Sequence, residues 1–304
     1  MKKQNSRSSS EKNQFIIGYR SYLESKGFTP EGINTYANRV KIYLQSNPDA
    51  ESYGYRQVLS YFESSHSIAL SDNRRKSILM QIKKYYDYLL ETGVREDHPC
   101  RLLNVKGRAT KGVIHSDLLS SAELELLLSR EERFEKVRLK NQVILSLLIY
   151  QGLMPGEIIK LKTSDIDLDA GTVRLRGGRV LMARTLQLLS KQILMMDKYI
   201  NKDRKKMLRT KTDSLIINYR GEGAAHAEDI GFIIEGCKGI FAGKDITTKT
   251  IRDSVISNWL NERKLPLEQV QLMAGHRWIS CTERYLQVSM DEQREILRKF
   301  HPLG

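Results

Sequence analysis

The stretch Leu272-Met-Ala-Gly-His-Arg-Trp-Ile-Ser-Cys-Thr-Glu-Arg-Tyr285 is the most distinctive segment of this chain. Taken singly, a histidine after a glycine is typical of a helix end, and a tyrosine beside a helix is typical of packing. Two upstream stretches accompany it, Lys249-Thr-Ile-Arg252 and residues 152–167, GLMPGEIIKLKTSDID. The three stretches in this order are more specific than any one of them alone.

These stretches resemble the motif boxes of the tyrosine recombinases, the phage-integrase-like family. The first is similar to the pattern LLGHxxixtTxxY, and the matching residues are Gly275, His276, Ile279, Thr282 and Tyr285. Residues 249–252 resemble the HxLR box, and residues 152–167 resemble the GLRxxEllxLxxxDid box. The resemblance covers nearly the whole chain. It implies a helical core-binding domain, a linker and a catalytic domain.

The resemblance also implies a reaction. Tyr285 is the expected nucleophile, which attacks a DNA phosphodiester to form a 3′-phosphotyrosine link and to free a 5′-hydroxyl. That link keeps the bond energy, so strands are resealed without ATP, metal or any other cofactor. Attack adds negative charge to the phosphate oxygens, which fork-like cations stabilise. By resemblance, Arg252 clamps the phosphate and His276 contacts the phosphate and the tyrosine region.

The sequence departs from the family pattern at two cationic positions. Met154 stands where the family has its first arginine, and methionine cannot donate to a phosphate oxygen. Loss of a comparable oxyanion donor costs roughly 2.7–4 kcal/mol of transition-state stabilisation. The family's hairpin lysine, its usual general acid, is also missing, because no lysine occurs between Lys162 and Lys191.

Other cations lie near these positions. Arg179 is nearest by alignment to the missing lysine, and Arg176 and Arg184 are close by. One of these arginines could supply the charge missing at Met154, and the sequence leaves open which one. Arginine is a poor proton donor because its pKa lies above about 12. Lys249, the first residue of its box, retains a donor and could take over proton transfer.

Two functional hypotheses follow, and a third competes with them. The first is an active site-specific recombinase or integrase of a mobile element, which the tyrosine box favours. The second is a catalytically degenerate DNA-binding accessory or regulatory protein of recombination, which Met154 and the missing lysine favour. The third is a basic helical interaction protein whose motif matches arise by chance. For the first, the resemblance implies duplex DNA and a homotetramer on two DNA sites as partners, with no small-molecule substrate.

The charge agrees with a polyanionic partner. The chain carries 50 Lys and Arg against 36 Asp and Glu, a net charge of +14. Residues 1–110 hold 18 basic and 11 acidic residues, and the remainder holds 32 and 25, so the excess is not confined to a tail. DNA touching both parts would explain this excess, and a generic basic surface would explain it equally well.

The composition also indicates a compartment. We find no apolar run long enough for a membrane span, and the N-terminus lacks the apolar core of a signal peptide. The three cysteines are far apart, and no two histidines have i, i+4 spacing, so neither a disulfide framework nor a metal site is expected. We therefore expect a cytoplasmic, nucleoid-associated protein without a membrane partner.

Periodicity predicts a mainly helical fold in two domains. We expect a disordered tail over residues 1–12, a four-helix DNA-binding domain over 13–96, a linker over 97–117 and the catalytic domain over 118–304. The fourth helix carries the candidate DNA-binding residues Arg74, Arg75, Lys76, Lys83 and Lys84, joined by Arg176 in the second domain. This mixture of cations and tyrosines suits phosphate contact, although a solvated helix face fits each residue singly.

The second domain is expected to contain a small antiparallel sheet. Residues 171–178 and 180–188 alternate in polarity around Gly177-Gly178, which indicates a hairpin turn. A further short strand is expected at residues 215–218. Helices are expected to fill the remainder of the domain.

Overall fold

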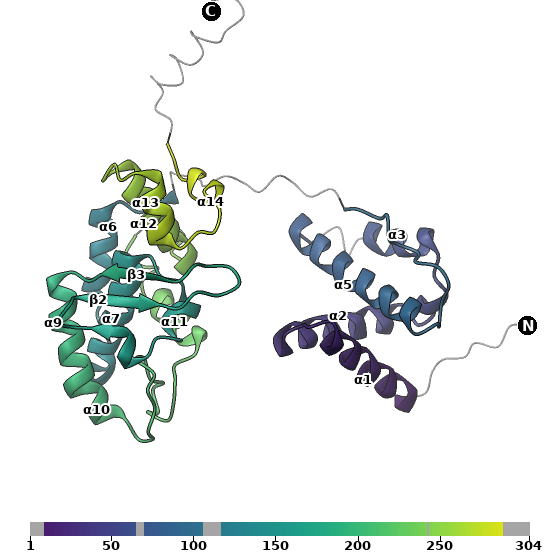
Figure 1. The fold of residues 1–304 in the computed structure, drawn as a ribbon, viewed down its shortest axis with the longest axis horizontal. Coiled ribbons are helices and arrows are strands. Elements are labelled where there is room, and N and C mark those ends of the chain that lie inside the picture. The colour runs from purple at the N-terminus through teal and green to yellow at the C-terminus, as the bar shows by residue number, and fades with distance from the viewer. Residues whose placement is uncertain (1–8, 65–69, 106–116, 242, 288–304) are drawn as a thin grey trace, which may run out of the picture. The chain divides into compact units, whose positions relative to one another are not determined.

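The computed structural model describes residues 9–64, 70–105, 117–241 and 243–287. The chain divides into two compact units, residues 1–111 and 112–304, each with its own buried core (Figure 1). The predicted fold class, mainly helical with a small antiparallel sheet, is confirmed. Among the described residues, no helix is both long enough and apolar enough to cross a membrane.

The described part of the first unit is built from helices. They are α1 (Ser9–Ser25), α2 (Pro30–Ser46), the 3-10 turn η1 (Ala50–Ser52), α3 (Tyr55–Glu63) and α5 (Asp72–Glu91). Helix α2 begins with Pro30 at its first position, and the Thr29 side chain accepts a hydrogen bond from the backbone N–H of Gly32. Ser71 caps α5 in the same way, by accepting from the N–H of Arg74.

Buried tyrosines dominate the core of this unit. Tyr19, Tyr43, Tyr85 and Tyr86 are all fully buried. The hydroxyls of Tyr43 and Tyr86 lie 3.1 Å apart, and the Tyr86 hydroxyl donates to the carbonyl of Ala50 at 2.8 Å. These bonds satisfy polar atoms that would otherwise be costly to bury. The tyrosines of α5 therefore serve packing in this unit.

Two boundaries of the first unit differ from the expected ones. Helix α1 begins at Ser9, so residues 9–12 belong to a helix and not to a tail. Within the expected linker, Cys100, Leu103 and Val105 are buried in the core of the first unit. Burial of these apolar side chains favours docking over a solvated linker. Residues 1–8 and 106–116 lie outside the described part.

The second unit contains the helices that build the site. They are α6 (Ser121–Leu126), η3 (Leu127–Ser129), α7 (Glu135–Gln151), α8 (Pro155–Ile158), η4 (Thr163–Asp165), α9 (Ser190–Lys198), the π turn η5 (Tyr199–Asp203), α10 (Arg204–Met207), α11 (Ala227–Glu235), α12 (Thr248–Asn261), α13 (Leu267–Ala274) and α14 (Ser280–Glu283). Helices α7 and α12 are the most deeply buried, and their apolar residues form much of the core. Gly152 ends α7 with a φ of 59°, a left-handed conformation that favours glycine.

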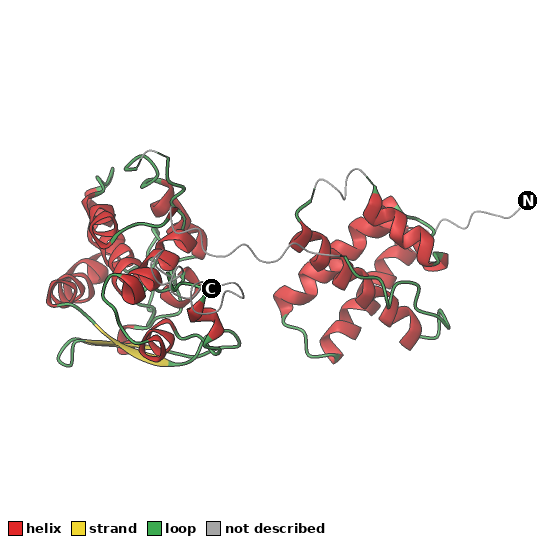
Figure 2. Ribbon diagram, turned by 90° about the horizontal axis from the view of Figure 1, so that it is seen from above, coloured by secondary structure: helices red, strands yellow, loops and turns green. Residues whose placement is uncertain are grey.

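The sheet lies along one side of the second unit (Figure 2). Its strands are β1 (Ile166–Asp167), β2 (Thr172–Leu175) and β3 (Arg184–Gln187), all antiparallel and in sequential order. In the predicted hairpin, Val173 pairs with Leu186, and the joining loop projects beyond the strands in Figure 1. Strand β1 was not predicted from the sequence, in which its two residues were assigned only to the motif box at residues 152–167.

Two strand predictions need correction. The second hairpin strand was expected from residue 180, but it begins at Arg184, because the N–H of Met182 instead bonds the carbonyl of Gly275. Residues 215–218 form no regular strand. Within them, Ile217 forms an isolated bridge with Ala224, and the preceding Ser214 forms one with Lys162.

Gly221 gives a stability prediction for the loop that follows α10. Its φ is 76°, and a Cβ placed there would lie 2.0 Å from the carbonyl oxygen of Met207. We expect Gly221→Ala to lower the free energy of unfolding by at least about 2 kcal/mol, because the left-handed backbone and the clash add. Urea unfolding followed by tryptophan fluorescence would measure this, since both tryptophans, Trp259 and Trp278, lie in the second unit.

Gly223→Ala is the matched control, because a Cβ there meets nothing within 4 Å. We expect it to change stability by less than about 0.5 kcal/mol. Equal effects of the two substitutions would show that the loop is not constrained at Gly221.

Candidate active site

Arg252 is the buried charge at the centre of the candidate site. Helix α12 begins after Thr247, whose side chain accepts from the N–H of Thr250, and Arg252 lies on its first turns. Its side chain is 91% buried, and its guanidinium donates to the carbonyls of Gly152 and Ala274, at the ends of α7 and α13. These bonds join three segments that are distant in the sequence. Burial lowers the pKa of Arg252 from its ordinary value.

His276 lies directly after Gly275, which ends α13 with a φ of 72°. Its Nε2 is 3.4 Å from an Arg252 amino group, and its Nδ1 is 2.9 Å from the hydroxyl of Thr282. Because arginine can only donate, we infer that Nε2 accepts and that Nδ1 carries the proton. Burial, with the charges of Arg252 and Arg184, lowers the pKa of His276 to about 4. The ring is therefore neutral at pH 7.

Tyr285 follows α14 and is buried, with 6% of its surface exposed. Its hydroxyl donates to Oδ1 of Asp253 at 2.7 Å, and its backbone carbonyl accepts from the side-chain amide of Asn261. The ring stacks on that of His276, with centroids 6.3 Å apart. Burial and the bond to Asp253 raise the pKa of Tyr285 above its ordinary value, so the hydroxyl is protonated at neutral pH.

Lys249 lies one helical turn before Asp253 on α12. Its ammonium group donates to Oδ2 of Asp253, and its side chain is 79% exposed. Asp253 thus bonds the tyrosine hydroxyl through one oxygen and the lysine through the other. The predicted residues Tyr285, Arg252 and Lys249 are brought into one cluster through this carboxylate and His276.

Met154 lies at the start of α8 with 43% of its surface exposed. Its backbone N–H donates to Oε2 of Glu157, whose Oε1 accepts from Arg184 at 2.7 Å. The same Oε2 lies 4.0 Å from the Arg252 guanidinium. Glu157 therefore lies between two buried arginines. Of the three hairpin arginines weighed for the charge missing at Met154, Arg184 is the one that reaches this carboxylate.

The hairpin loop is attached to the His276 segment through the backbone. Leu181 forms a bridge with His276, and Arg277 donates to the carbonyl of Gly178. Arg179 lies exposed in this loop, and no side-chain partner for it occurs among the described residues. The role of Arg179 as the cation that replaces the missing lysine therefore stays a prediction.

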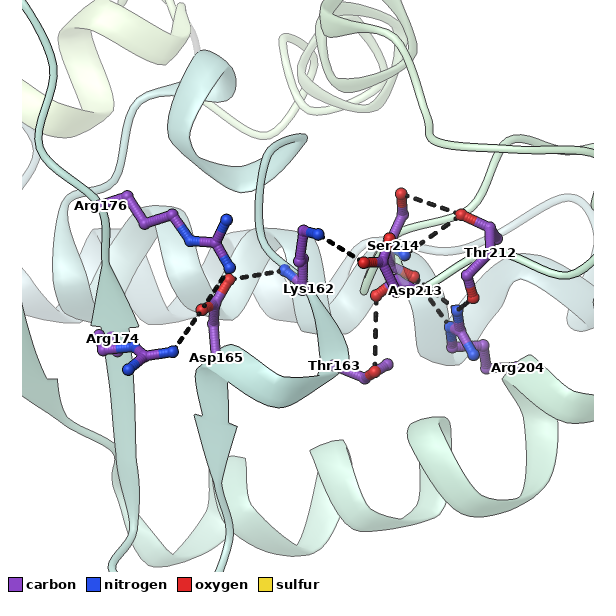
Figure 3. A network of polar contacts seen from close by, with 9 residues as sticks. All are labelled: Lys162, Thr163, Asp165, Arg174, Arg176, Arg204, Thr212, Asp213 and Ser214. Atoms are coloured by element: carbon purple, nitrogen blue, oxygen red, sulfur yellow. Dashed lines mark hydrogen bonds and ion pairs between the residues drawn. The ribbon is translucent and has the colours of Figure 1, made fainter.

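A groove of about 800 Å³ lies beside the hairpin loop, and it is lined in part by Met154, Lys160, Arg176 and Arg179. Arg176, together with Arg174, bonds the buried Oδ1 of Asp165, and Lys162 pairs with Asp213 nearby (Figure 3). More than half of the Arg176 side chain remains exposed. The groove is therefore rich in basic groups, some of them held by carboxylates. 

The model of the phage integrase family matches residues 117–292, more than half of the chain. The chain belongs to this family. This match confirms the family that the motif boxes indicated. The chain is a tyrosine-type site-specific recombinase.

Individual relatives agree with this membership. Tyrosine recombinase XerD of Ralstonia nicotianae is 26% identical over 247 residues, which cover 80% of this chain and 78% of the relative. XerD of Listeria innocua is 27% identical over 302 residues, which cover 95% of this chain and 99% of the relative. The chain is thus similar to these recombinases over most of its length.

Solved structures share the fold. XerH recombinase bound to difH DNA after cleavage superposes with a TM-score of 0.70 at 19% identity, covering 97% of this chain and 90% of XerH. The Tn1549 transposon integrase in complex with circular intermediate DNA gives a TM-score of 0.68 at 14% identity, covering 94% of this chain and 99% of that one. At these identities the likeness concerns the fold alone.

The candidate DNA-binding residues of α5 differ in their surroundings. Arg75 donates to the carbonyl of Phe62, Lys83 donates to that of Arg101, and Lys84 pairs with Asp87. Arg74 and Lys76 are exposed, and no partner for either occurs within the described ranges. A role in DNA binding stays a prediction for all five residues, and Arg74 and Lys76 could take it without breaking an internal contact.

Sequence reasoning gave no role to two carboxylates of this recombinase site, Glu157 and Asp253. Glu157 stands inside a quoted motif box, and Asp253 follows Arg252 directly. The i, i+4 spacing of Lys249 and Asp253 could have revealed their ion pair on a helix. Nothing in the sequence revealed the contact of Asp253 with Tyr285. Among the described residues, no three His, Cys, Asp or Glu side chains lie close enough together to hold a metal ion.

His276 gives a pH prediction for the recombinase. Its folded pKa of about 4 lies below the ordinary 6.5, so between these values the unfolded chain binds more protons than the folded one. The contribution of His276 to stability therefore rises with pH from about 4 to about 6.5 and falls as the pH is lowered. Urea unfolding of the wild type and of His276→Gln at several pH values would measure it. A stability difference that does not change with pH in this window would contradict the prediction.

Proposed function

We propose that this recombinase cleaves and rejoins duplex DNA through a 3′-phosphotyrosine link formed by Tyr285. The observation that carries the proposal is the convergence of Arg252, from α12, with His276 and Tyr285, from the stretch at residues 272–285. A chain that only bound DNA would need no buried tyrosine hydroxyl beside a buried arginine and a neutral histidine. The net charge of +14 supports DNA as the partner.

Each residue of the cluster has a role in this reaction. Arg252 supplies positive charge next to the phosphate oxygens, on which negative charge grows during attack. His276, neutral and held by Thr282, contributes hydrogen bonding without a second positive charge. Lys249, which is exposed, is the candidate donor of a proton to the leaving 5′-oxygen. Arg179 adds positive charge from the hairpin loop.

The proposal extends to the wider setting of the reaction. Strand exchange between two duplexes would engage a homotetramer on two DNA sites, in the cytoplasm and at the nucleoid. We assign the chain to the recombinases of mobile elements on the resemblance of its tyrosine box to those of phage-integrase-like proteins, since the fold is shared with XerH and a transposon integrase alike.

Met154 favours a second candidate function. Without the first arginine and the hairpin lysine, the chain would act as a DNA-binding accessory or regulatory protein of recombination. Its buried Tyr285 would then serve packing alone. The contacts that Arg252, His276 and Asp253 make around the tyrosine make the active recombinase the stronger candidate.

Covalent trapping tests the choice. We expect a denaturation-resistant adduct when the protein is incubated with nicked suicide DNA carrying its cognate sites, and no adduct with Tyr285→Phe, which lacks the nucleophilic oxygen. Because the proposed cations are side chains, EDTA should leave the adduct unchanged. DNA binding without an adduct would favour the accessory protein, and loss of the adduct in EDTA would contradict the proposed chemistry.

Met154 gives a prediction of its own. We expect Met154→Arg to raise the rate of adduct formation, because it places a guanidinium where the family has one. The site then gains a group that donates hydrogen bonds to the DNA phosphate. The gain is bounded by the worth of such a donor, about 100- to 1000-fold. Met154→Gln, of similar length and without charge, is the matched control. Equal rates for the two variants would show that another cation, such as Arg184, already fills this role.

A further inference from the structure

We propose that Asp253 is a catalytic residue, the base that takes the proton from the Tyr285 hydroxyl as it attacks DNA. This inference rests on the proposed function and adds a residue to its chemistry. It starts from geometry: Asp253 Oδ1 accepts from the Tyr285 hydroxyl at 2.7 Å, and within the described part of the chain it is the only hydrogen-bond partner of that oxygen. This distance is that of a proton donor and a base in contact.

His276 is the other candidate base, and its bonds exclude it in this arrangement. Its Nδ1 is engaged with the hydroxyl of Thr282, and its Nε2 faces the guanidinium of Arg252. Although its ring stacks on that of Tyr285, neither nitrogen bonds the phenol oxygen. A proton that leaves the Tyr285 oxygen therefore meets a carboxylate before it meets an imidazole.

The surroundings of Asp253 suit a base. The residue is buried, with 7% of its surface exposed, so bulk water does not replace it as proton acceptor. Its second oxygen, Oδ2, accepts from the Lys249 ammonium group, so the carboxylate is held in place while Oδ1 faces the phenol. Other charges near the phenol are Arg252 and Arg284, whose guanidinium lies 5.7 Å from the ring centroid of Tyr285. An aspartate takes a hydroxyl proton in the same manner in protein kinases.

The step balances with groups already placed in the site. The Tyr285 oxygen forms a bond to phosphorus, and its proton moves to Oδ1 of Asp253. The bond from phosphorus to the 5′-oxygen breaks, and that oxygen takes a proton from the Lys249 ammonium group. The products are a phosphotyrosine diester, a free 5′-hydroxyl, a neutral carboxylic acid and a neutral amine. Religation runs through the same groups in reverse.

A purely structural role is the competing explanation, in which Asp253 only holds the Tyr285 ring in place. Asp253→Asn separates the two roles, because an amide oxygen still accepts the hydrogen bond but cannot take the proton. We expect this variant to form the covalent adduct about 100- to 10,000-fold more slowly than the wild type. Glu262→Gln is the matched control. It neutralises a carboxylate at the other end of α12, where Glu262 bonds Ser121, and should leave the rate unchanged.

A more acidic phenol distinguishes a base from a residue that only positions the ring, because it changes the need for a base and leaves the packing the same. With 3,5-difluorotyrosine incorporated at position 285, the nucleophile needs less help from a base. Fluorination should therefore narrow the rate difference between Asp253 and Asp253→Asn proteins by at least about tenfold. If fluorination changes both rates by the same factor, Asp253 positions the ring and the inference is overturned.

Two further comparisons keep the outcome decisive. If Asp253→Asn proves unfolded by tryptophan fluorescence, Asp253→Glu and Asp253→Gln give the same contrast at equal side-chain size, and equal rates for that pair would overturn the inference. The wild type and Tyr285→Phe are run alongside. Absence of an adduct in the wild type would refute the proposed function itself, whereas an adduct that forms equally fast with Asp253→Asn would refute only the role of Asp253.

Discussion

The buried guanidinium of Arg252 is the interaction on which the candidate site depends. A buried charge is tolerated only when its hydrogen-bonding groups find partners, and Arg252 finds them at Gly152 and Ala274. Both are carbonyls at helix ends, where the last turn leaves acceptors free and the helix dipole is negative. Because Arg252 needs these two carbonyl acceptors, the C-terminal ends of α7 and α13 must both lie against α12. Met154 follows the first of these ends closely, and His276 the second.

Carboxylates hold the other cations of the site. Glu157 lies between Arg184 and Arg252, and Asp253 lies beside Lys249. Glu157 reduces the repulsion between its two buried neighbours, and Asp253 pairs with the exposed Lys249. The arrangement gathers several cations near one tyrosine without leaving a buried charge unpaired. An incoming phosphate would then join a network in which positive charge is already balanced.

Much of the fold and part of the site followed from the sequence, because local signals there have local causes. The helical periodicity, the alternating polarity of the two hairpin strands and the spacing of the tyrosine box are short-range patterns, whereas the expected turn at Gly177-Gly178 is instead a longer loop over residues 176–183. The predicted start of β3 was wrong, and the burial of the segment around Cys100 was not predicted. Both failures have a tertiary cause. Each depends on a partner far along the chain, as does the contact between Asp253 and Tyr285, 32 residues apart. Periodicity carries no information about such partners.

The backbone attachment of the hairpin loop to the His276 segment also limits how the chain can vary. Leu181 and Met182 are fixed by their bonds to His276 and Gly275, while the loop residues before them are exposed. An insertion after Met182 would shift the register of β3 and carry the Arg184 side chain away from Glu157. An insertion at the exposed tip would leave both attachments intact. Length variation among related chains should therefore concentrate at the tip, where new residues would move Arg179 but would leave the contacts of Arg184 and His276 in place.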